Sequence, residues 1–449
     1  MLAGVAAVLA GIGLAEALVG SRLVTSFARQ SGGADPIVRP PVTLLKPLHG
    51  DEPLLAEALA TLCRQDYPSW QIVFGVQDAT DSAIGVVRRL QARFPSLDID
   101  LVIDPTLHGR NRKVGNLINM ISAARHDVLV IADADVHVRS DYLNRLVAAL
   151  ERPGVGLVTT LYAGLPAAVA RGSASGSGVR PAPCPDAARR PRTDDTAVAG
   201  GRAIGLAARL GAMQITHGFL PSALVARALG RQDCLGATMC LRRRDLESIG
   251  GLHALVEHLA DDNVLGRRIN GLGSSVVLAD TVALTTVPES SFGALFRHEL
   301  RWARTIRALE PAGFAASVIQ YPLVWALLTV LLSGGAAWSV GCFLLAWMLR
   351  AVAALSVDRA LAPLWRTRQA WSSGQAWSGQ ASSGQAWSGG NDQAAVAFCC
   401  PIWLLPLRDV FSVAVMAASY GGRKVHWRGH GLHADTPPPP AHQSVTLRL

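Results

Sequence analysis

The sequence predicts an α/β fold, built on a mostly parallel sheet with helices on both faces and with membrane helices near both ends. Three observations lead to this class. Strand-like and helical patterns alternate between residues 41 and 161, long apolar stretches lie toward both ends of the chain, and one apolar strand runs into two carboxylates. Because ligands collect at the carboxyl ends of strands in open α/β sheets, the acidic pair also predicts the edge that carries a site.

The composition indicates that part of the chain lies in lipid. Half of the 449 residues are hydrophobic, only 17% are charged, and the mean hydropathy is +0.28. The net charge is +9, but the basic residues are spread along the chain and lie beside apolar segments. We therefore expect the basic residues to contact the anionic surface of the lipid bilayer. We do not expect the protein to bind nucleic acid.

Residues 1–22 predict a retained N-terminal transmembrane anchor. The stretch 2–20 is apolar except for Glu16, and Arg22 and Arg29 follow it. No basic segment precedes the apolar run, which disfavours a cleaved signal peptide. Positive charge on the carboxyl side favours an anchor whose amino end lies outside and whose following chain lies in the cytoplasm.

Residues 40–290 are expected to form one cytoplasmic α/β domain. Its alternating pattern predicts a parallel, doubly wound sheet, which a strand-rich segment at 274–287 closes. The expected strands are Val42–Leu45, Gln71–Gln77, Ile99–Ile103 and Asp127–Ala132, and the expected helices are Pro53–Arg64, Ser82–Phe94 and Val114–Ala124.

Two segments are too poor in apolar residues to form a core. Residues 166–200 are a run of Ala, Gly, Ser, Pro and Arg, which predicts a disordered insertion in the α/β domain. Residues 358–393 contain an imperfect Trp-Ser-Gly repeat across Gln369–Gly390. The repeat unit is too short to fold by itself, so we expect a low-complexity linker.

The remaining part of the chain predicts membrane elements. Residues 291–310 include Phe292–Leu309, a basic amphipathic helix expected at the membrane surface. Two transmembrane helices are expected within 311–357, near 312–333 and 336–356.

A further membrane segment is expected at 394–420, before a basic, Pro-rich tail at 421–449. Three full crossings after a cytoplasmic domain would place the basic tail outside, against the positive-inside tendency. The charged pair Arg408 and Asp409 leaves a second possibility open, in which the segment is re-entrant or lies on the surface.

Four polar clusters are candidates for the site, and the first two lie at predicted element ends. Asp78 ends the strand in Val76-Gln77-Asp78, where it can accept hydrogen bonds from a uracil or a ribose; the alternative is an ordinary turn residue. Asn111 and Lys113 lie in a polar loop that enters a helix, and a helix amino terminus beside an ammonium group binds anions. A solvated basic loop is the alternative there.

The other two clusters are acidic. Asp133 and Asp135 follow the apolar run Val128–Ala132 and form a hard oxygen site suited to Mg²⁺ or Mn²⁺ with a diphosphate. Asp261 and Asp262 open a predicted helix, where carboxylates are commonly only caps. Held near a reacting hydroxyl, one of them would instead serve as a general base.

These clusters together resemble a known family. Asp78, Asp133 and Asp262, followed by His298-Glu299-Leu300-Arg301-Trp302, are similar to the D, D, D, (Q/R)xxRW signature of family 2 and family 21 glycosyltransferases. The pieces closest to the ceramide glucosyltransferase group are Lys46-Pro47-Leu48-His49-Gly50, Asp66-Tyr67-Pro68, Val76-Gln77-Asp78, Asn111–Leu117 and Gly236–Cys240.

Within that group the chain most resembles the hopanoid-biosynthesis-associated glycosyltransferases of bacteria. The similarity covers residues 40–165 and 200–310 and the arrangement between membrane segments. One position departs from the signature, since His298 stands where Gln or Arg is found. The insertion and the Trp-Ser-Gly repeat have no counterpart in the resemblance.

The resemblance implies a GT-A nucleotide-diphospho-sugar transferase fold, an αβα sandwich on the cytoplasmic side of a bacterial inner membrane. Asp78 would recognise the UDP moiety, and Asp133 with Asp135 would hold Mg²⁺ or Mn²⁺ on the diphosphate. Further substrate contacts are implied for Lys46, Asn111, Lys113, Asp261, His298, Arg301 and Trp302.

Asp262 matches the position of the catalytic base, so the resemblance implies that it takes the proton from the acceptor hydroxyl during an inverting displacement. Among the other residues, Arg301 would clamp the diphosphate and Trp302 would line the sugar or acceptor pocket. Asp261 would share a proton with Asp262 or cap the helix.

The function expected first is transfer of one N-acetylglucosamine from UDP to a membrane lipid, a hopanoid polyol such as bacteriohopanetetrol. The alternative in the same class is a ceramide glucosyltransferase that uses UDP-glucose. A processive polysaccharide synthase and a non-catalytic membrane scaffold remain as other classes. Gly218–Leu229 and Phe292–Leu309 are expected on the side where lipid enters, with plain packing as the alternative for both.

Overall fold

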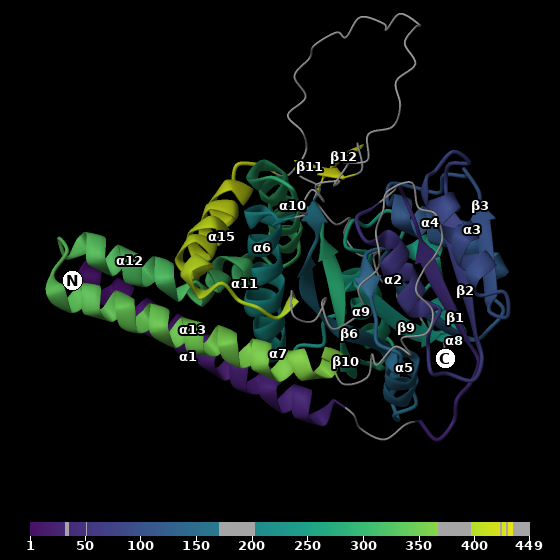
Figure 1. The fold of residues 1–449 in the computed structure, drawn as a ribbon, viewed down its shortest axis with the longest axis horizontal. Coiled ribbons are helices and arrows are strands. Elements are labelled where there is room, and N and C mark those ends of the chain that lie inside the picture. The colour runs from purple at the N-terminus through teal and green to yellow at the C-terminus, as the bar shows by residue number, and fades with distance from the viewer. Residues whose placement is uncertain are drawn as a thin grey trace, which may run out of the picture.

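The computed structural model describes residues 1–31, 36–50, 52–169, 203–366, 397–422, 424–427 and 430–433. An α/β domain lies at one end, and an arm of long helices extends from it (Figure 1). Most of the predicted insertion, the Trp-Ser-Gly repeat and most of the tail lie outside the described residues.

The domain is built on an eight-stranded sheet of order β3-β2-β1-β4-β9-β6-β10-β5. Neighbouring strands are parallel from β3 to β4 and between β6 and β10, as predicted. Its strands are β1 (Val42–Pro47), β2 (Trp70–Val76), β3 (Asp98–Ile103), β4 (Val128–Ala132), β5 (Val136–His137), β6 (Val155–Pro166), β9 (Thr238–Arg242) and β10 (Ser275–Val287).

Two strands correct the expectation of a simple doubly wound sheet. β9 runs antiparallel to both β4 and β6, and the short β5 runs antiparallel to β10. Strand direction depends on how the chain returns to the sheet, and a five-residue apolar run carries no information about that return.

β4 is buried on both faces, as its uninterrupted apolar sequence predicts. Val128 and Val130 belong to one core cluster, whereas Leu129 and Ile131 belong to the other. This alternation is the period of two that places successive strand side chains on opposite faces.

Helices cover both faces of the sheet and confirm the αβα sandwich. One face packs on α2 (Leu55–Leu62), α3 (Ala83–Arg93) and α5 (Tyr142–Leu150). The other packs on α4 (Arg112–Met120), α8 (Arg243–Ser248) and α9 (Asp261–Gly271).

The ordered chain continues further into the expected insertion than its composition suggests. β6 runs to Pro166, and the short strand β7 (Ala168–Val169) pairs with β8 (Ala203–Ile204). This pairing brings the chain on either side of the insertion together. Next to β7, Ala167 N donates a hydrogen bond to Val287 O of β10 at 3.1 Å.

The N-terminal helix α1 (Leu2–Gln30) is longer than the expected anchor. Its first half exposes apolar side chains such as Val5, Val8 and Ile12. Its second half packs through Val24 and Ala28 on the core of the α/β domain, so the apolar face continues past Arg22.

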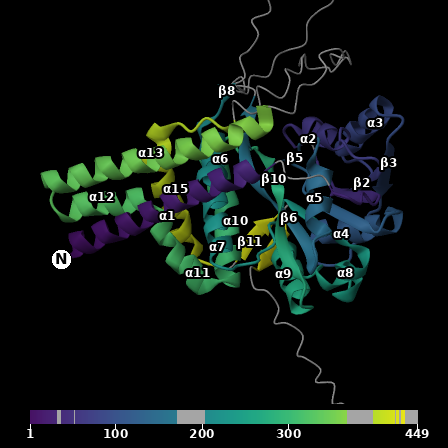
Figure 2. The ribbon, with the colours of Figure 1, turned by 90° about the horizontal axis from the view of Figure 1, so that it is seen from below.

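α1 forms an arm with α12 (Pro322–Leu332) and α13 (Ala337–Arg366), as Figures 1 and 2 show. We call these three helices the membrane arm. The turn between α12 and α13 uses Gly334 and Gly335, both at positive φ, a conformation that glycine adopts without strain.

The span expected near 312–333 is broken. α11 (Pro311–Ala316) and η4 (Ser317–Gln320) form a segment bent by 67° from α12. The break falls at Tyr321, directly before Pro322, because a proline disfavours the helical conformation of the residue that precedes it.

The linker expected from residue 358 begins later, since α13 continues to Arg366. Its last turns are buried on the domain through Val357, Leu361 and Trp365. These side chains pack on residues that are distant in sequence. The local composition therefore did not indicate that the helix extends to Arg366.

The last helix does not break at its charged pair. η5 (Ile402–Leu404) leads into α15 (Leu405–Ser419), and Arg408 and Asp409 are buried within that continuous helix. In both views α15 crosses the membrane arm steeply instead of running along it.

The chain after α15 returns to α10 (Phe292–Leu309), the helix expected at the membrane surface. Arg307 Nη2 donates a hydrogen bond to Gly422 O at 2.9 Å. By length and composition, α1, α13 and the Ile402–Ser419 segment would each span a membrane, and the bent α11–α12 pair is a fourth candidate.

α6 (Leu206–Met213), η2 (Gln214–Phe219) and α7 (Leu220–Ala228) form a continuous helix between the domain and the arm. η2 is a π-helical turn. The expected lipid-entry segment 218–229 packs on α1 at Gly20, where a Cβ atom would lie 2.9 Å from Pro221 Cβ.

Close helix packing in the arm generates a first prediction. A Cβ atom on Gly13 would lie 2.2 Å from the carbonyl oxygen of Ile319, whereas Gly11 has open space around it. We expect Gly13→Ala to lower the stability of the detergent-solubilised protein by about 1–3 kcal/mol, because the helices must separate. Thermal unfolding of Gly13→Ala and of the matched Gly11→Ala variant measures this, and equal midpoints would contradict the packing.

Candidate active site

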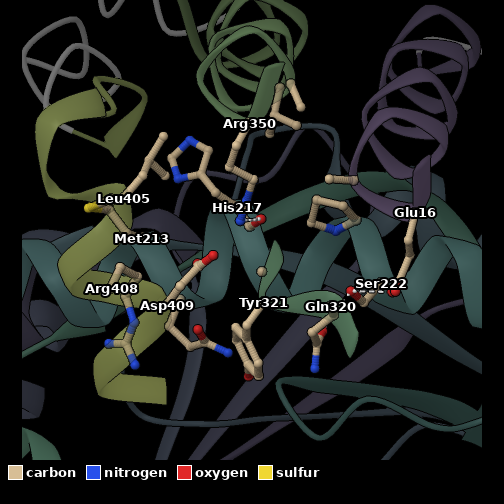
Figure 3. A pocket seen from close by; sticks show the side chains of 16 residues that line it. Glu16, Met213, His217, Ser222, Gln320, Tyr321, Arg350, Leu405, Arg408 and Asp409 are labelled. Carbon is tan, nitrogen blue, oxygen red and sulfur yellow. Dashed lines mark hydrogen bonds between the residues drawn. The ribbon is translucent and has the colours of Figure 1, made fainter. Parts of the chain in front are cut away.

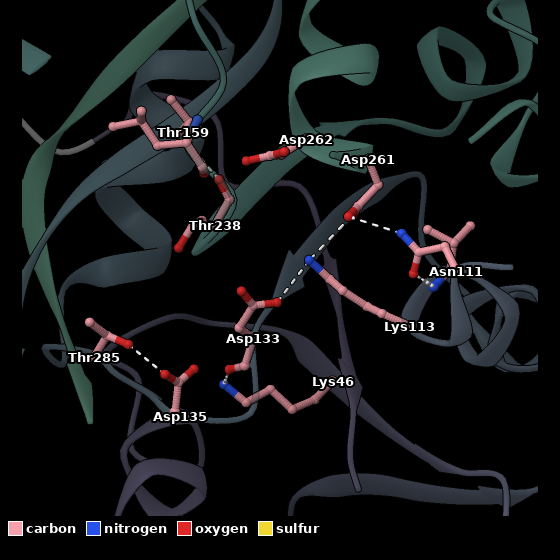
Figure 4. A network of polar contacts seen from close by, with 12 residues as sticks. Lys46, Asn111, Lys113, Asp133, Asp135, Thr159, Thr238, Asp261, Asp262 and Thr285 are labelled. Carbon is pink, nitrogen blue, oxygen red and sulfur yellow. Dashed lines mark hydrogen bonds and ion pairs between the residues drawn. The ribbon is translucent and has the colours of Figure 1, made fainter. Parts of the chain in front are cut away.

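The acidic clusters converge at the carboxyl edge of β4 (Figure 4). Lys113 Nζ lies 2.8 Å from Asp133 Oδ1 and 3.3 Å from Asp261 Oδ2. Burial opposes the charge on this ammonium, but Asp133 and Asp261 raise the pKa of Lys113 above its ordinary value. The Lys113 ammonium group therefore joins the end of β4 to the start of α9. Lys113, Asp133 and Asp261, which the sequence predicted as site residues, lie in contact.

Asp262 lies next to this ion pair at the start of α9, as the sequence predicted. Burial and the neighbouring Asp261 raise the pKa of Asp262 from 3.8 to about 6, while Lys113 acts in the opposite direction. A carboxylate with this pKa is a better proton acceptor near neutral pH than an ordinary aspartate.

Gly236 leaves the room that Asp262 occupies. A Cβ atom on Gly236 would lie 2.7 Å from Asp262 Oδ2. The resemblance included Gly236 in the segment Gly236–Cys240 but implied no role for it. In the structure, a side chain at this position would collide with Asp262.

Asp135 lies on the other side of Asp133. Thr285 Oγ1 donates a hydrogen bond to Asp135 Oδ2 at 2.5 Å, and burial together with Asp133 raises the pKa of Asp135. Two neighbouring carboxylates repel each other, and a cation between them relieves that repulsion.

Among the described residues, no group of three or more His, Cys, Asp or Glu side chains forms a metal site. Asp133 and Asp135 nevertheless fit Mg²⁺ or Mn²⁺, because these ions prefer oxygen ligands and take several of them from substrate phosphates and water. The carboxylate of Asp133 is partly exposed, which leaves it accessible to such a complex.

Lys46 lies beneath the acidic loop and is fully buried. Its ammonium donates to the carbonyl oxygen of Asp133 and, at 3.4 Å, to that of Val136. Burial lowers the pKa of Lys46 to about 8, although Asp135 and Asp133 oppose this shift. In this structure Lys46 holds the loop in place, and its expected substrate contact stays a prediction.

Asn111 is also buried and caps α4. Its Oδ1 accepts a hydrogen bond from Val114 N at 3.1 Å, and its Nδ2 donates to His258 O at 2.8 Å and to Asp261 Oδ1 at 3.3 Å. Asn111 therefore orients Asp261, and its expected contact with the diphosphate or sugar remains untested.

Asp78 follows β2, two strands from β4 in the sheet. Its Oδ1 accepts hydrogen bonds from Thr80 N at 2.8 Å and Thr80 Oγ1 at 2.7 Å, and these bonds lower the pKa of Asp78. The side chain is exposed on the same sheet edge as Asp133, as recognition of a nucleoside requires.

The His-x-x-Arg-Trp motif lies on α10. His298 Nδ1 contacts Glu289 Oε1, and the His298 ring lies 4.4 Å from the Trp302 ring in an edge-on arrangement. Trp302 packs with a cluster that includes Val287 and Ile215, beside Tyr162 and Phe219. Arg301 lies between His298 and Trp302, and its contact with a diphosphate remains a prediction.

Sequence reasoning missed Tyr162 and the partner of Glu299. Tyr162 stands on β6 with its ring 4.9 Å from that of Phe219, and burial, Asp262, Asp133 and Asp135 all raise its pKa. It therefore lies between the carboxylates and the aromatic cluster. A single tyrosine in an apolar strand gives no signal of this position.

Glu299, the second residue of the motif, forms a two-point ion pair with Arg408 of α15. Its oxygens lie 2.8 Å from Arg408 Nη1 and 2.7 Å from Arg408 Nη2. Both side chains are buried. Arg408, one of the charged pair that left a re-entrant or surface-lying segment open, therefore attaches α15 to the motif helix.

An αβα sandwich with carboxylates at the ends of its strands is the arrangement of a GT-A glycosyltransferase, as the resemblance implied. The profile of glycosyl transferase family 21 matches residues 5–173 and 196–438. The chain belongs to this family and is a glycosyltransferase.

Curated relatives match over shorter stretches. The ceramide glucosyltransferase of Komagataella phaffii is 36% identical over 115 residues, which cover 25% of this chain and 23% of the relative. The beta-monoglucosyldiacylglycerol synthase of Synechocystis sp. is 25% identical over 128 residues, which cover 28% of this chain and 26% of the relative. The matches span about a quarter of each relative's length.

Two solved structures are similar to nearly the whole chain. The mannosyltransferase PcManGT from Pyrobaculum calidifontis, in complex with GDP-Man and Mn²⁺, is 18% identical with a TM-score of 0.48 and covers 94% of this chain and 99% of its own. S. aureus TarS 1–349 in complex with UDP-GlcNAc is 12% identical with a TM-score of 0.34 and covers 89% and 98%.

The raised pKa of Asp262 generates a prediction about pH. If its carboxylate must be deprotonated to act, kcat/KM falls as the pH drops through about 6. Asp261→Asn removes a negative neighbour, so we expect the acid limb to move to lower pH. Rate profiles between pH 4.5 and pH 8, roughly the window in which this limb falls, measure the shift.

The control for this profile is Asp245→Asn in α8, where Asp245 pairs with Arg244 at the surface, away from the carboxylate cluster. An acid limb that stays in place in Asp261→Asn, or that moves equally in Asp245→Asn, would refute the assignment to Asp262.

Proposed function

We propose that this glycosyltransferase moves a single sugar from a UDP-sugar to a hydroxyl group of a membrane lipid. The observation that carries the proposal is the convergence of Asp133, Lys113, Asp261 and Asp262 beside aromatic residues that adjoin the membrane helices. With this arrangement, the nucleotide-sugar and a lipid acceptor from the bilayer bind at the same edge of the sheet.

The relatives favour ceramide and glucose over the acceptor and sugar expected first. These relatives are a ceramide glucosyltransferase and a beta-monoglucosyldiacylglycerol synthase. The expectation of N-acetylglucosamine transfer to a hopanoid polyol has no support among them. We therefore propose glucose transfer from UDP-glucose to ceramide or a ceramide-like lipid as the leading assignment.

In the proposed reaction, Asp78 accepts hydrogen bonds from the nucleoside at the exposed end of β2. Asp133 and Asp135 would hold Mg²⁺ or Mn²⁺, which would supply positive charge to the diphosphate of the leaving UDP. Lys113 holds Asp133 and Asp261 in fixed positions, so the carboxylates do not have to reorganise when the donor binds.

Asp262 takes the proton from the lipid hydroxyl as that oxygen attacks the anomeric carbon. The bond to UDP breaks on the opposite face, so the configuration inverts and an α-linked donor gives a β-glycoside. Trp302 and Tyr162 line the approach from the membrane side, where their rings cover the sugar or the acceptor.

The proposed orientation places the α/β domain in the cytoplasm of a bacterial cell, on the inner membrane. With the amino end outside, α1 crosses inward and the α12–α13 pair crosses outward and back. Because α15 crosses the arm steeply and Gly422 returns to α10, the chain leaves α15 on the domain's side. This arrangement agrees with the positive-inside tendency and favours a surface-lying α15.

A processive polysaccharide synthase is disfavoured by the same arm. A growing polymer needs a channel, and α1 packs directly on η4 and the start of α12 at Gly13, where no room is left for a Cβ atom. The intact carboxylate cluster likewise disfavours a non-catalytic scaffold.

The test is a product assay. Membranes that contain the protein are incubated with UDP-glucose or UDP-N-acetylglucosamine and with ceramide, diacylglycerol or bacteriohopanetetrol, and lipid products are identified by mass. We expect a single hexose on ceramide. A hopanoid product would restore the first expectation, a polymer would favour the synthase, and no glycolipid from any pair would refute lipid glycosylation.

A matched pair of variants tests the base. We expect Asp262→Asn to lower the transfer rate by about 10²–10⁴-fold, because the acceptor proton loses its carrier. UDP binding, measured by calorimetry, should persist because the nucleotide contacts lie elsewhere. Asp245→Asn serves as the control, and a transfer rate in Asp262→Asn equal to that of the control would eliminate Asp262 as the base.

A further inference from the structure

The motif on α10 contains a histidine, His298, where the family signature has glutamine or arginine. Glutamine and arginine both carry N–H donors, whereas each ring nitrogen of a neutral histidine is either a donor or an acceptor. The contact that one ring nitrogen makes decides which of the two carries the proton. What His298 offers to a ligand therefore depends on the partner of its ring.

That partner is Glu289, which lies between β10 and α10 and is 8% exposed. Its Oε1 accepts a hydrogen bond from His298 Nδ1. Among the described residues, no other side chain pairs with this carboxylate. Because an ionised carboxylate can only accept, the proton of the neutral ring lies on Nδ1, and Nε2 carries a lone pair.

The Nε2 atom of His298 faces away from Glu289, because the two nitrogens lie on opposite sides of the imidazole ring. The side chain of His298 is 30% exposed and that of Glu289 only 7%. The exposed part of the ring is therefore the part that includes Nε2, and no described residue bonds to that atom. A ligand beside the Trp302 ring, 4.4 Å away, can reach it.

Strand β10 connects this ring to the donor site. Thr285 of β10 donates a hydrogen bond to the Asp135 carboxylate, as Figure 4 shows. Glu289 follows Thr285 by four residues, which span at most about 14 Å. A UDP-sugar whose diphosphate lies at Asp135 would extend its sugar across part of this distance.

The aromatic cluster supports the same placement. Trp302, whose ring contacts His298, packs in one cluster with Tyr162. Tyr162 in turn interacts electrostatically with Asp262, Asp133 and Asp135. The His298 ring thus lies on the side of the cluster where a sugar between the diphosphate and the base would be exposed.

The backbone of α10 is held independently of Glu289. Glu299, the residue after His298, forms its two-point ion pair with Arg408. Arg408 lines a cavity of about 20 Å³ between α1, α13 and α15 (Figure 3). Replacing Glu289 therefore leaves this anchor in place and acts on the orientation and proton of the His298 ring.

We propose that His298 Nε2 accepts a hydrogen bond from a hydroxyl group of the transferred sugar, and that Glu289 is the positioning residue that makes the ring an acceptor. A site that hydrogen-bonds a substrate hydroxyl discriminates against analogues that lack it. A glutamine at this position would need no carboxylate partner, because its own oxygen accepts. The assignment rests on the proposed use of a UDP-sugar and adds the residues that recognise its sugar.

Calorimetry tests the assignment without a lipid acceptor. The detergent-solubilised full chain is titrated, with Mn²⁺ present, with UDP, UDP-glucose and UDP-N-acetylglucosamine. The sugar preference is the Kd for UDP divided by the Kd for the UDP-sugar that binds more tightly. We expect Glu289→Gln to lower this preference about fivefold, because the hydrogen bond to the sugar is weakened. The Kd for UDP should stay unchanged.

The matched control is Glu151→Gln, which removes a carboxylate that pairs with Arg242 at 2.8 Å on another part of the domain. It should leave the sugar preference as in the wild type. An unchanged preference in Glu289→Gln, or an equal loss in Glu151→Gln, would overturn the proposal.

A double-mutant cycle separates positioning from a merely structural role. His298→Gln supplies the residue of the signature, and in that background Glu289→Gln should change the preference by less than about twofold. A loss of the same size in both backgrounds would show that Glu289 does not act through His298.

Thermal unfolding shows whether each variant is folded. If Glu289→Gln is not, His298→Phe decides the question, because it keeps a ring beside Trp302 but has no acceptor. It should lose the preference, and a preference as in the wild type would refute the role of Nε2.

The outcomes also separate this assignment from the proposed function. A wild-type chain that binds a UDP-sugar but glycosylates no lipid contradicts lipid glycosylation alone, and the variants still decide the roles of His298 and Glu289. A wild-type chain that binds neither UDP-sugar would overturn both proposals.

Discussion

The ion pair of Lys113 with Asp133 and Asp261 is the interaction on which the site depends. Charges attract strongly where little water screens them, and removing one partner of such a group leaves the others unpaired. Lys113 therefore fixes the end of β4 against the start of α9. From below, Lys46 holds the same loop through backbone carbonyls. Burial raises the pKa of Asp262, and Asp261, which this frame holds beside it, raises that pKa further.

A second buried ion pair joins α10, which carries the His-x-x-Arg-Trp motif, to α15. Glu299 lies within the His-x-x-Arg-Trp motif, and Arg408 lies on α15. The helix that carries Trp302 is thus attached to a helix that crosses the arm steeply. Through α10, the aromatic cluster around Trp302 is therefore held in a fixed position relative to α15.

Local patterns were enough to place the chemistry on its elements. Asp78 and Asp133 follow strands, Asn111 caps α4, and Asp261 and Asp262 open α9, as the sequence predicted. Strand ends and helix starts are encoded within a few residues by apolar runs and capping side chains. The αβα class followed from the same alternation.

Contacts between distant segments decided the rest. The antiparallel course of β9, the bend before Pro322 and the burial of Arg408 in an unbroken helix depend on partners far along the chain. The role of Tyr162 likewise appears only when β6 lies beside η2 and the carboxylates. The sequence alone determined which polar residues lie at strand ends and helix starts, because those signals are local. Only tertiary packing decided which of them face one another, because it selects among partners that no short pattern specifies.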